Sequence, residues 1–174
     1  MIHLYFIRHG QSELNAREIF AGCLDTPLTK RGCQQAAAAG EQAKAVSFDL
    51  IVSSPLVRAL ETAQIVAQEA GYPLDAIRQS DLFKERSLGK LEGKPWTTYD
   101  ESADHDLASD KAMGVEPMAE LVERARKGLV FLQNQPAETI LVVGHGSFYR
   151  ALCTALDPSQ SYDEPPNTQI IQLV

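Results

Sequence analysis

Cysteine is scarce in this 174-residue sequence, which holds only three and no Cys-x-x-Cys pair. The odd number and the spacing exclude a disulfide framework and the usual structural zinc sites. We therefore expect Cys23, Cys33 and Cys153 to be reduced thiols packed in the protein interior, as in a cytoplasmic protein. No His or Cys spacing suggests a metal cage, and we expect neither a metal nor another cofactor.

Long hydrophobic runs and an excess of basic residues are also lacking. The apolar start, Ile2 to Ile7, is too short for a signal-peptide core and leads directly into Arg8, and no other run approaches the length that spans a membrane. Because 16 Lys and Arg face 23 Asp and Glu, for a net charge of -7, a broad nucleic-acid footprint is disfavoured. We expect a cytoplasmic protein that binds neither membrane nor nucleic acid.

Strand-like and helix-like segments alternate along the chain, and no linker or repeat divides it, so residues 1–174 are expected to form a single domain. Short apolar runs predict strands at 2–7, 50–52, 140–143 and 169–174. Helical spacing follows at 30–45, 56–70, 118–132 and 147–156, with expected caps at Thr29, Ser54 and Ser147 and a stop at Gly71. Between them lie a weaker extended segment, 74–83, and a loop, 84–95.

This order predicts an α/β fold with a largely parallel sheet covered by helices on both faces. In such sheets the ligand site lies beyond the carboxyl ends of the strands. Two predicted strands end in histidine, at His9 and His145, and a third leads to the helix that carries Arg58. These side chains are therefore candidates for one common site.

Two arginines and two histidines at one sheet edge would suit a tetrahedral dianion such as phosphate. The planar forks of Arg8 and Arg58 can each donate two charge-assisted hydrogen bonds. Neighbouring cations would keep a histidine ring neutral, with a lone pair free to attack phosphorus. A carboxylic acid of raised pKa would protonate the leaving group. Backbone N–H groups beside two glycines would add neutral donors: Gly10 and Gly146.

At this point the sequence resembles the histidine phosphatase superfamily, in the branch typified by phosphoglycerate mutases. Five blocks occur in the family's order: Arg-His-Gly-x-Ser-x-x-Asn at 8–15, Thr-Pro-Leu-Thr at 26–29, Ser-Ser-Pro-Leu at 53–56, the acid-bearing loop at 82–93 and Gly-His-Gly at 144–146. The resemblance implies a three-layer sandwich with a mostly parallel central sheet flanked by helices.

The resemblance also assigns roles that the residues alone leave open, above all which histidine is the nucleophile. It makes His9 the phosphorylated residue, Arg8 and Arg58 the phosphoryl-binding arginines, His145 a hydrogen-bonding partner of the phosphoryl oxygens, and Glu85 the general acid and base. Glu92 is the second choice for the acid. The further residues expected to contact phosphate or substrate are Ser12, Asn15, Gly22, Thr26, Arg86 and Gly146.

Hydrolysis is favoured over mutase chemistry by the segment Thr97 to Glu116, which is short and acidic and has Lys111 as its only basic residue. Such acids would repel a phosphorylated carboxylic acid. Leu14 and Leu88 also stand where mutases of this kind have tryptophan and tyrosine. The expected function is a metal-independent phosphomonoesterase, of the histidine acid type, working through phosphohistidine on a small phosphorylated substrate.

Three alternatives stay open: a phosphoglycerate mutase-type phosphotransferase, a phosphohistidine protein phosphatase acting on a phosphoprotein, and a phosphate-binding domain without turnover. The sequence does not determine the oligomeric state. His3 and His105 are expected to be a packed or surface histidine and a solvated one, without a role in the site.

Overall fold

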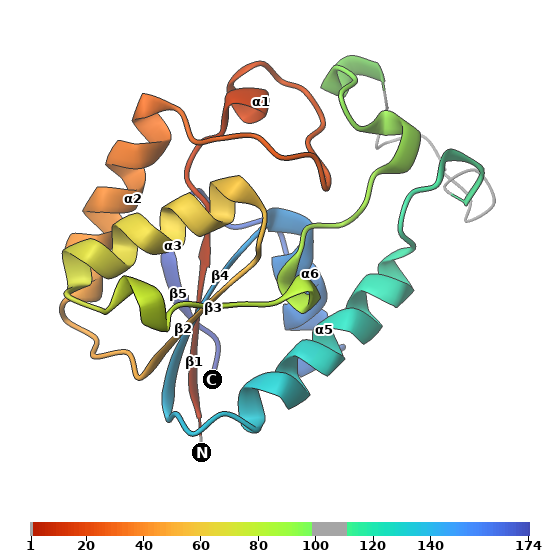
Figure 1. Ribbon diagram of the computed structural model, residues 1–174. Coiled ribbons are helices and arrows are strands. Elements are labelled where there is room, and N and C mark those ends of the chain that lie inside the picture. Colours follow the sequence, from red (N-terminus) through yellow and green to blue (C-terminus); the bar gives the residue numbers. More distant parts are fainter. Residues whose placement is uncertain (1, 99–110) are drawn as a thin grey trace.

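The computed structural model describes residues 2–98 and 111–174, which form a five-stranded sheet in the order β3-β2-β4-β1-β5 (Figure 1). The strands β3, β2, β4 and β1 pair in parallel, whereas β5 is antiparallel to β1. Their bounds are β1 His3–Arg8, β2 Leu50–Ser53, β3 Arg78–Gln79, β4 Thr139–Gly144 and β5 Ile170–Gln172.

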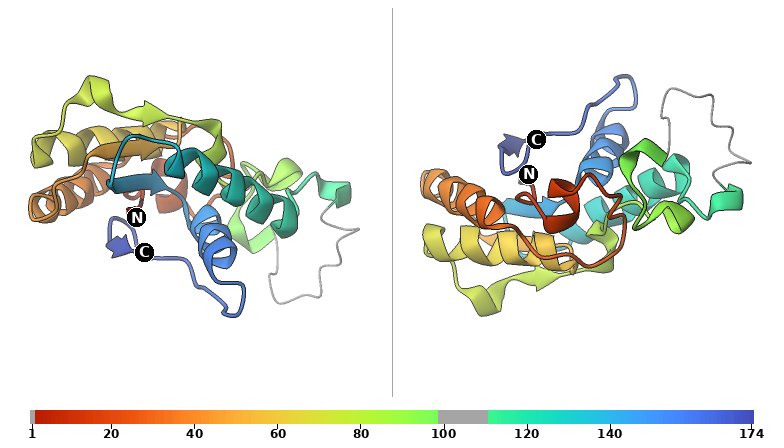
Figure 2. Two further views of the ribbon diagram at one scale, coloured as in Figure 1. Left: turned by 90° about the horizontal axis from the view of Figure 1, so that it is seen from below. Right: turned by 90° about the horizontal axis from the view of Figure 1, so that it is seen from above.

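Helices cover both faces of this sheet, with α2 and α3 on one side and α5 and α6 on the other (Figure 1, Figure 2). The α/β sandwich that the sequence predicted is therefore confirmed. The helices are α1 Glu13–Ala16, α2 Lys30–Ala43, α3 Val57–Ala70, α5 Met118–Gln133 and α6 Gly146–Leu156. Four short 3₁₀ turns are also described: η1 Leu74–Ala76, η2 Asp81–Phe83, η3 Gly89–Leu91 and η4 Trp96–Thr98.

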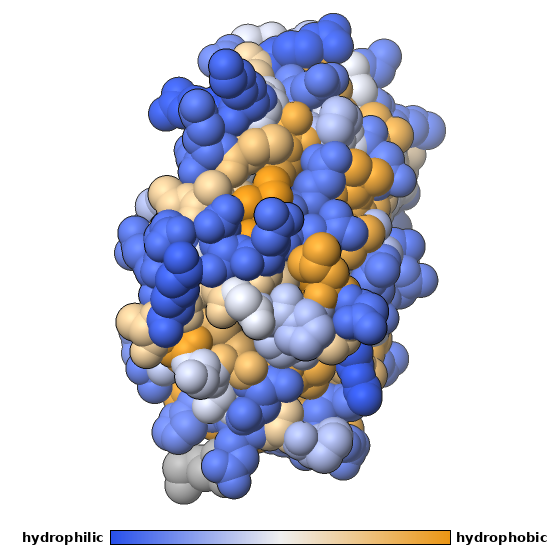
Figure 3. Space-filling model, turned by 60° about the vertical axis from the view of Figure 1, so that its left-hand side comes forward, coloured by the Kyte–Doolittle hydropathy of each residue, from blue (hydrophilic) through white to orange (hydrophobic). Residues whose placement is uncertain are grey.

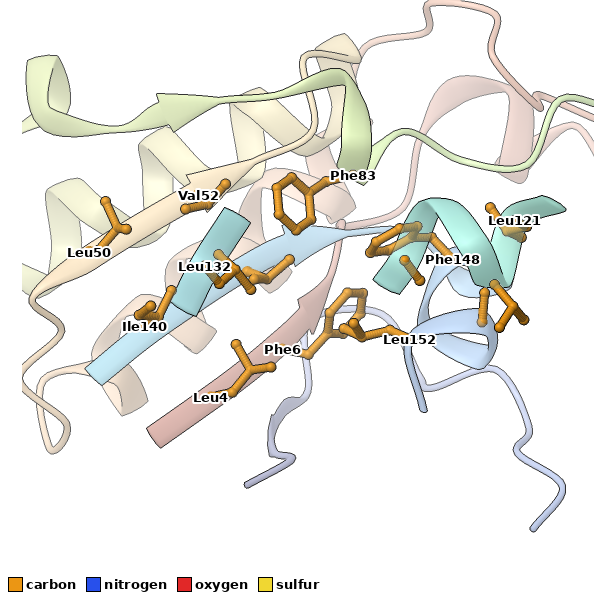
Figure 4. Close-up of a cluster of buried hydrophobic side chains, with 14 residues drawn as sticks. Leu4, Phe6, Leu50, Val52, Phe83, Leu121, Leu132, Ile140, Phe148 and Leu152 are labelled. Atoms are coloured by element: carbon orange, nitrogen blue, oxygen red, sulfur yellow. The ribbon is translucent and has the colours of Figure 1, made fainter. Parts of the chain in front are cut away.

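Alternate strand residues supply two separate cores, because successive side chains of a strand point to opposite faces. Leu4 and Phe6 of β1 pack toward α5 and α6, where they meet Phe148 and Leu152 (Figure 4). Ile7 faces α2 and α3, whose core positions are mainly alanine. Burying each large apolar side chain stabilises the fold by about 1.5–3 kcal/mol, and these two cores fix the strand ends that carry the site.

The helix ends agree with the sequence at Thr29, whose hydroxyl accepts from the backbone N–H of Gly32, and at Gly71, which ends α3 in the left-handed conformation at φ 74°. The expected cap at Ser54 was wrong. Helix α3 begins at Val57, and the Ser54 hydroxyl instead accepts from the N–H of Leu56 at 3.2 Å.

The expected cap at Ser147 was also wrong, because α6 begins one residue earlier, at Gly146. The segment 74–83 is not one extended strand, since two 3₁₀ turns flank the two-residue β3. Of the cysteines, Cys153 is buried and Cys23 half-buried, but Cys33 is exposed on α2, beside the buried position Gly32. The interior packing expected for all three thiols therefore fails for Cys33.

Hydrophilic side chains, interspersed with smaller apolar groups, cover the face that lies to the left in Figure 1 (Figure 3). None of the helices in 2–98 and 111–174 is long and apolar enough to cross a membrane. His3 is exposed, whereas His105 and the acidic residues of 99–110 lie outside the described part. The single-domain organisation stays a prediction.

Candidate active site

The parallel pairing of β1 with β4 brings the two strand-end histidines together. Arg8 is in register with Gly144, and the N–H of His9 donates to the Gly144 carbonyl at 3.0 Å. The rings of His9 and His145 lie with their centroids 5.2 Å apart. Both side chains are almost fully buried, at 3% and 0% exposure.

The His9 ring is held with Nε2 unprotonated. Its Nδ1 lies 2.7 Å from the Gly10 carbonyl oxygen, so the ring proton is on Nδ1, and Nε2 accepts from Arg58 Nε at 3.2 Å. Burial lowers the pKa of His9 well below its usual value, and the positive charges of Arg58 and Arg8 lower it further. The neutral ring therefore keeps an Nε2 lone pair available down to acid pH.

Arg58 lies in the first turn of α3 and is 1% exposed. Its two terminal nitrogens donate to the carbonyls of Leu24 at 2.9 Å and Gly22 at 2.7 Å, so the arginine fastens the loop before α2 to the site. Gly22 has φ 48°, and a Cβ there would lie 2.3 Å from Glu92 Oε1. Only glycine fits this turn without strain.

His145 and Arg8 carry unsatisfied nitrogens. His145 Nε2 lies 2.8 Å from Ser54 Oγ, and Arg8 Nη1 donates to the Pro165 carbonyl at 3.0 Å. Among the described residues, the buried side-chain nitrogens without a hydrogen-bond partner are Arg8 Nε and His145 Nδ1. Burial, followed by the charge of Arg58, lowers the pKa of His145 well below its usual value. Buried polar atoms without partners are rare, so these two nitrogens are open to a hydrogen bond with water or a ligand.

Glu85 is anchored at the N-terminus of α6. Its carboxylate accepts from the backbone N–H groups of Ser147 at 3.2 Å, Phe148 at 3.0 Å and Arg86 at 2.8 Å. These bonds favour the charged form, but burial is the larger effect and raises the pKa of Glu85 above its usual value. Glu85 is thus a candidate proton donor, displaced from its ordinary pKa in the direction opposite to His9.

Three backbone N–H groups at or near the two glycines, those of Gly10, Ser147 and Phe148, have hydrogen-bond partners within the protein. The N–H of Gly10 donates to Thr62 Oγ1 at 3.0 Å. At the start of α6, the N–H groups of Ser147 and Phe148 bind the Glu85 carboxylate. The positive end of the α6 dipole therefore lies at the Glu85 carboxylate and stabilises its charged form.

Arg124 of α5 was missed by the sequence analysis. Its guanidinium donates to the carbonyls of Leu82, Lys84 and Glu85, at 2.7–3.1 Å, and pairs with the Glu116 carboxylate at 2.8 Å. The loop that carries Glu85 is thereby fixed to α5. Glu116, the last residue of the acidic segment, is thus held in an ion pair and is 17% exposed. The sequence feature that could have pointed to Arg124 is its position directly before the buried Ala125 of an amphipathic helix.

One pocket of about 420 Å³ joins these groups, lined by Arg8, His9, Arg58 and Glu85. Three of the other predicted contacts, Asn15, Gly22 and Arg86, also line it. His145 packs against His9 behind this wall. Ser12, Thr26 and Gly146 are not on it.

Ser12 and Thr26 shape the loop and do not line the pocket. Ser12 is fully buried and caps α1, with its hydroxyl accepting from the N–H of Asn15 at 3.3 Å. Thr26 Oγ1 accepts from the N–H of Leu14 at 3.2 Å. Their hydroxyls hold the segment after β1 in place, and the contact with substrate expected of them stays a prediction. Glu92, the second choice for the acid, accepts from the N–H groups of Cys23 and Leu88 and likewise fixes a loop.

Glu164, which the sequence analysis also missed, reaches the pocket from the segment between α6 and β5. Its carboxylate lies 3.2 Å from Arg8 Nη1. A Cβ at Gly146 would come within 2.2 Å of it, so glycine there makes room for this side chain. The neighbouring Asn167 donates its amide N–H to the His9 carbonyl at 2.6 Å. No sequence pattern marks this polar segment.

Comparison with known families identifies the arrangement. The family model of the histidine phosphatase superfamily, branch 1, matches residues 4–172. The chain belongs to this superfamily. Within the described residues, no group of three or more His, Cys, Asp or Glu side chains converges as metal ligands do.

Relatives in the superfamily include both phosphatases and mutases. An uncharacterized phosphatase, PhoE, of Bacillus subtilis is 34% identical over 90% of this chain and 78% of its own. A 2,3-bisphosphoglycerate-dependent phosphoglycerate mutase of Brucella canis is 35% identical over 96% and 88%. The solved structure of a mycobacterial glucosyl-3-phosphoglycerate phosphatase in complex with VO3 is 26% identical, with a TM-score of 0.84 over 99% of this chain and 92% of that one.

Proposed function

We propose that the protein hydrolyses phosphomonoesters, without a metal, through a phosphohistidine on His9. The observation that carries the proposal is the pairing, in one pocket, of a buried neutral histidine with a half-buried carboxylic acid whose pKa is displaced in the opposite direction. Where two titratable groups of one site have pKa values displaced in opposite directions, the group with the raised pKa is the candidate acid and the group with the lowered pKa is the candidate nucleophile.

In the first step, the Nε2 lone pair of His9 forms the bond to phosphorus while the ester P–O bond breaks. Glu85 gives its proton to the departing alcohol oxygen. Arg8 and Arg58 balance the negative charge of the phosphoryl group, and the unpartnered Nε of Arg8, a residue of the pocket lining, donates to one of its oxygens.

In the second step, the Glu85 carboxylate takes a proton from water, whose oxygen attacks the phosphohistidine. The P–N bond breaks, inorganic phosphate forms, and Nε2 regains its lone pair. Glu85 ends protonated, ready for the next turnover. The substrate is a small phosphorylated molecule, with a phosphohistidine on a partner protein as the other candidate class.

The test is phosphate release from a panel of phosphomonoesters in EDTA, comparing wild type with the variants His9→Ala and Glu85→Ala. We expect release by wild type, none by His9→Ala and a 10²–10⁴-fold lower rate for Glu85→Ala. The control is His3→Ala, since this histidine is exposed and far from the pocket lining. Activity that survives His9→Ala, or that EDTA abolishes, would contradict the proposal.

A second function, mutase-type phosphoryl transfer, is favoured by Arg86 and Arg150, two further arginines on the pocket wall. Such cations can hold the carboxylate of a phosphorylated acid. The discriminating assay is interconversion of 2- and 3-phosphoglycerate with a bisphosphate primer. Primer-dependent interconversion faster than phosphate release would establish the mutase in place of the phosphatase.

A further inference from the structure

Beyond the catalytic groups, the pocket lining combines polar side chains with a group of apolar ones. Its volume of about 420 Å³ is in the range of sites for small organic ligands, roughly 300–1,000 Å³, and exceeds the needs of a phosphoryl group alone. Six large apolar side chains line it besides the polar groups: Ile19, Phe20, Leu88, Leu91, Trp96 and Val115.

Three chain segments build this apolar wall, and backbone hydrogen bonds hold them together. The N–H of Phe20 donates to the Lys94 carbonyl at 2.9 Å, and the N–H of Trp96 donates to the Glu18 carbonyl at 2.8 Å. The third segment joins where the N–H of Glu116 donates to the Ser87 carbonyl at 2.8 Å. The wall is therefore preformed, in the same pocket as the catalytic cluster.

Trp96 contributes the most exposed of these side chains. It is 42% exposed and lines the pocket, whereas Leu91 and Val115 are 4% exposed. An aromatic ring left partly in water beside a catalytic group gains by covering its face with another apolar or aromatic surface. Arg86 and Arg150 also line the pocket, and their positive charges would instead favour a substrate with a carboxylate.

We propose that this wall binds the leaving group, and that the preferred substrates are phosphomonoesters of apolar, especially aromatic, alcohols. The inference deepens the proposed function, since it concerns the same site. It makes Trp96 a specificity-determining residue that contacts the alcohol part of the ester while His9 attacks the phosphorus and Glu85 protonates the departing oxygen.

Binding without turnover gives the first test, because Trp96 is the only tryptophan in the chain. Its fluorescence is titrated in the His9→Ala variant with benzyl phosphate, ethyl phosphate, 3-phosphoglycerate and inorganic phosphate. We expect benzyl phosphate to shift the emission and to bind at least ten times more tightly than ethyl phosphate. Equal affinities, or tightest binding of 3-phosphoglycerate, would overturn the inference in favour of the arginines.

Turnover gives the second test. Benzyl and ethyl alcohols have similar acidity, so their esters differ in contact with the wall more than in intrinsic reactivity. Trp96→Ala should raise KM for benzyl phosphate five- to tenfold relative to KM for ethyl phosphate, and Trp96→Phe should restore most of the difference. The control is Leu74→Ala, an exposed apolar residue of η1 outside the pocket, which should leave the KM ratio as in wild type.

The two proposals fail in different ways. If wild type hydrolyses no ester yet benzyl phosphate binds more tightly than ethyl phosphate, the hydrolytic function is wrong and the apolar subsite stands. If wild type hydrolyses both esters with equal KM and Trp96→Ala changes neither, the hydrolytic function stands and the subsite is wrong.

Discussion

Replacing Arg124 with alanine removes the group that fixes the acid-bearing loop to α5. The guanidinium donates to three loop carbonyls, pairs with Glu116 and lies 5.7 Å from the centre of the Phe148 ring. After the substitution, the carbonyls lose their donor and the Glu116 carboxylate loses its cation. Glu85, whose own carbonyl is among the three, loses one of its anchors.

The loss in free energy of unfolding expected for Arg124→Ala can be estimated from the burial of the groups involved. Removing one member of a buried ion pair costs about 3–5 kcal/mol. The side chains of Arg124 and Glu116 keep 20% and 17% exposure, so water relieves part of that penalty. The same water hydrates the freed carbonyls, which keeps their cost well below the roughly 1–3 kcal/mol of a fully buried unsatisfied group. We expect the free energy of unfolding to fall by about 2–4 kcal/mol, a large share of the roughly 5–15 kcal/mol typical of a domain.

Arg126→Ala, two residues further along the same helix, is the matched control. Its ion pair with Glu123 joins side chains that are 53% and 56% exposed, and such pairs contribute about 0–0.5 kcal/mol. The assay is urea unfolding of wild type and both variants, with kcat measured below the transition. Arg124→Ala should also lower kcat about 10–100-fold through misplacement of the acid. Equal unfolding midpoints for the two variants would refute the reasoning.

Further predictions concern the acid, the phosphate site, the core and a helix end. Glu85→Gln keeps a similar shape but cannot donate a proton, so it should lower kcat/KM about 10²–10⁴-fold and abolish the alkaline limb of the pH–rate profile. That limb lies above the ordinary carboxyl range, since burial raises the pKa of Glu85; a limb that persists in the variant would contradict the assignment. Glu164→Gln removes the carboxylate that pairs with Arg8 and should lower the inhibition constant of inorganic phosphate several-fold, with Asp163→Asn as the control; an unchanged constant would show that the pair does not compete with phosphate. Leu141→Ala, at a fully buried strand position, should cost about 2–5 kcal/mol in thermal or urea unfolding. Gly71→Ala should cost only about 1 kcal/mol, because φ is 74° but no atom lies within 4 Å of the added Cβ; a larger loss would point to a contact beyond the backbone conformation.

The order of elements and the histidine positions could be predicted from the sequence. Buried strands appear as short apolar runs, and His9 and His145 follow two of them directly. The carboxyl ends of parallel strands lie at the same edge of the sheet, so a residue that directly follows a predicted strand can be placed at that edge from the sequence. Helix starts were less predictable. Ser54 and Ser147 both carry the hydroxyl motif, but the Ser54 hydroxyl lies 2.8 Å from His145 Nε2, and the N–H of Ser147 donates to the distant Glu85.

Only the tertiary structure decided how the site is held and what surrounds the phosphoryl position. Arg124 and Glu164 come from segments without a motif, and they reach the site through packing between elements distant in sequence. Ser12 and Thr26 stand in family-like motifs, yet their hydroxyls serve loop backbone because buried N–H groups require acceptors. The sequence therefore determined which strand ends carry the chemistry. Side-chain packing and hydrogen-bond satisfaction across distant segments determined which groups line the pocket and which support it.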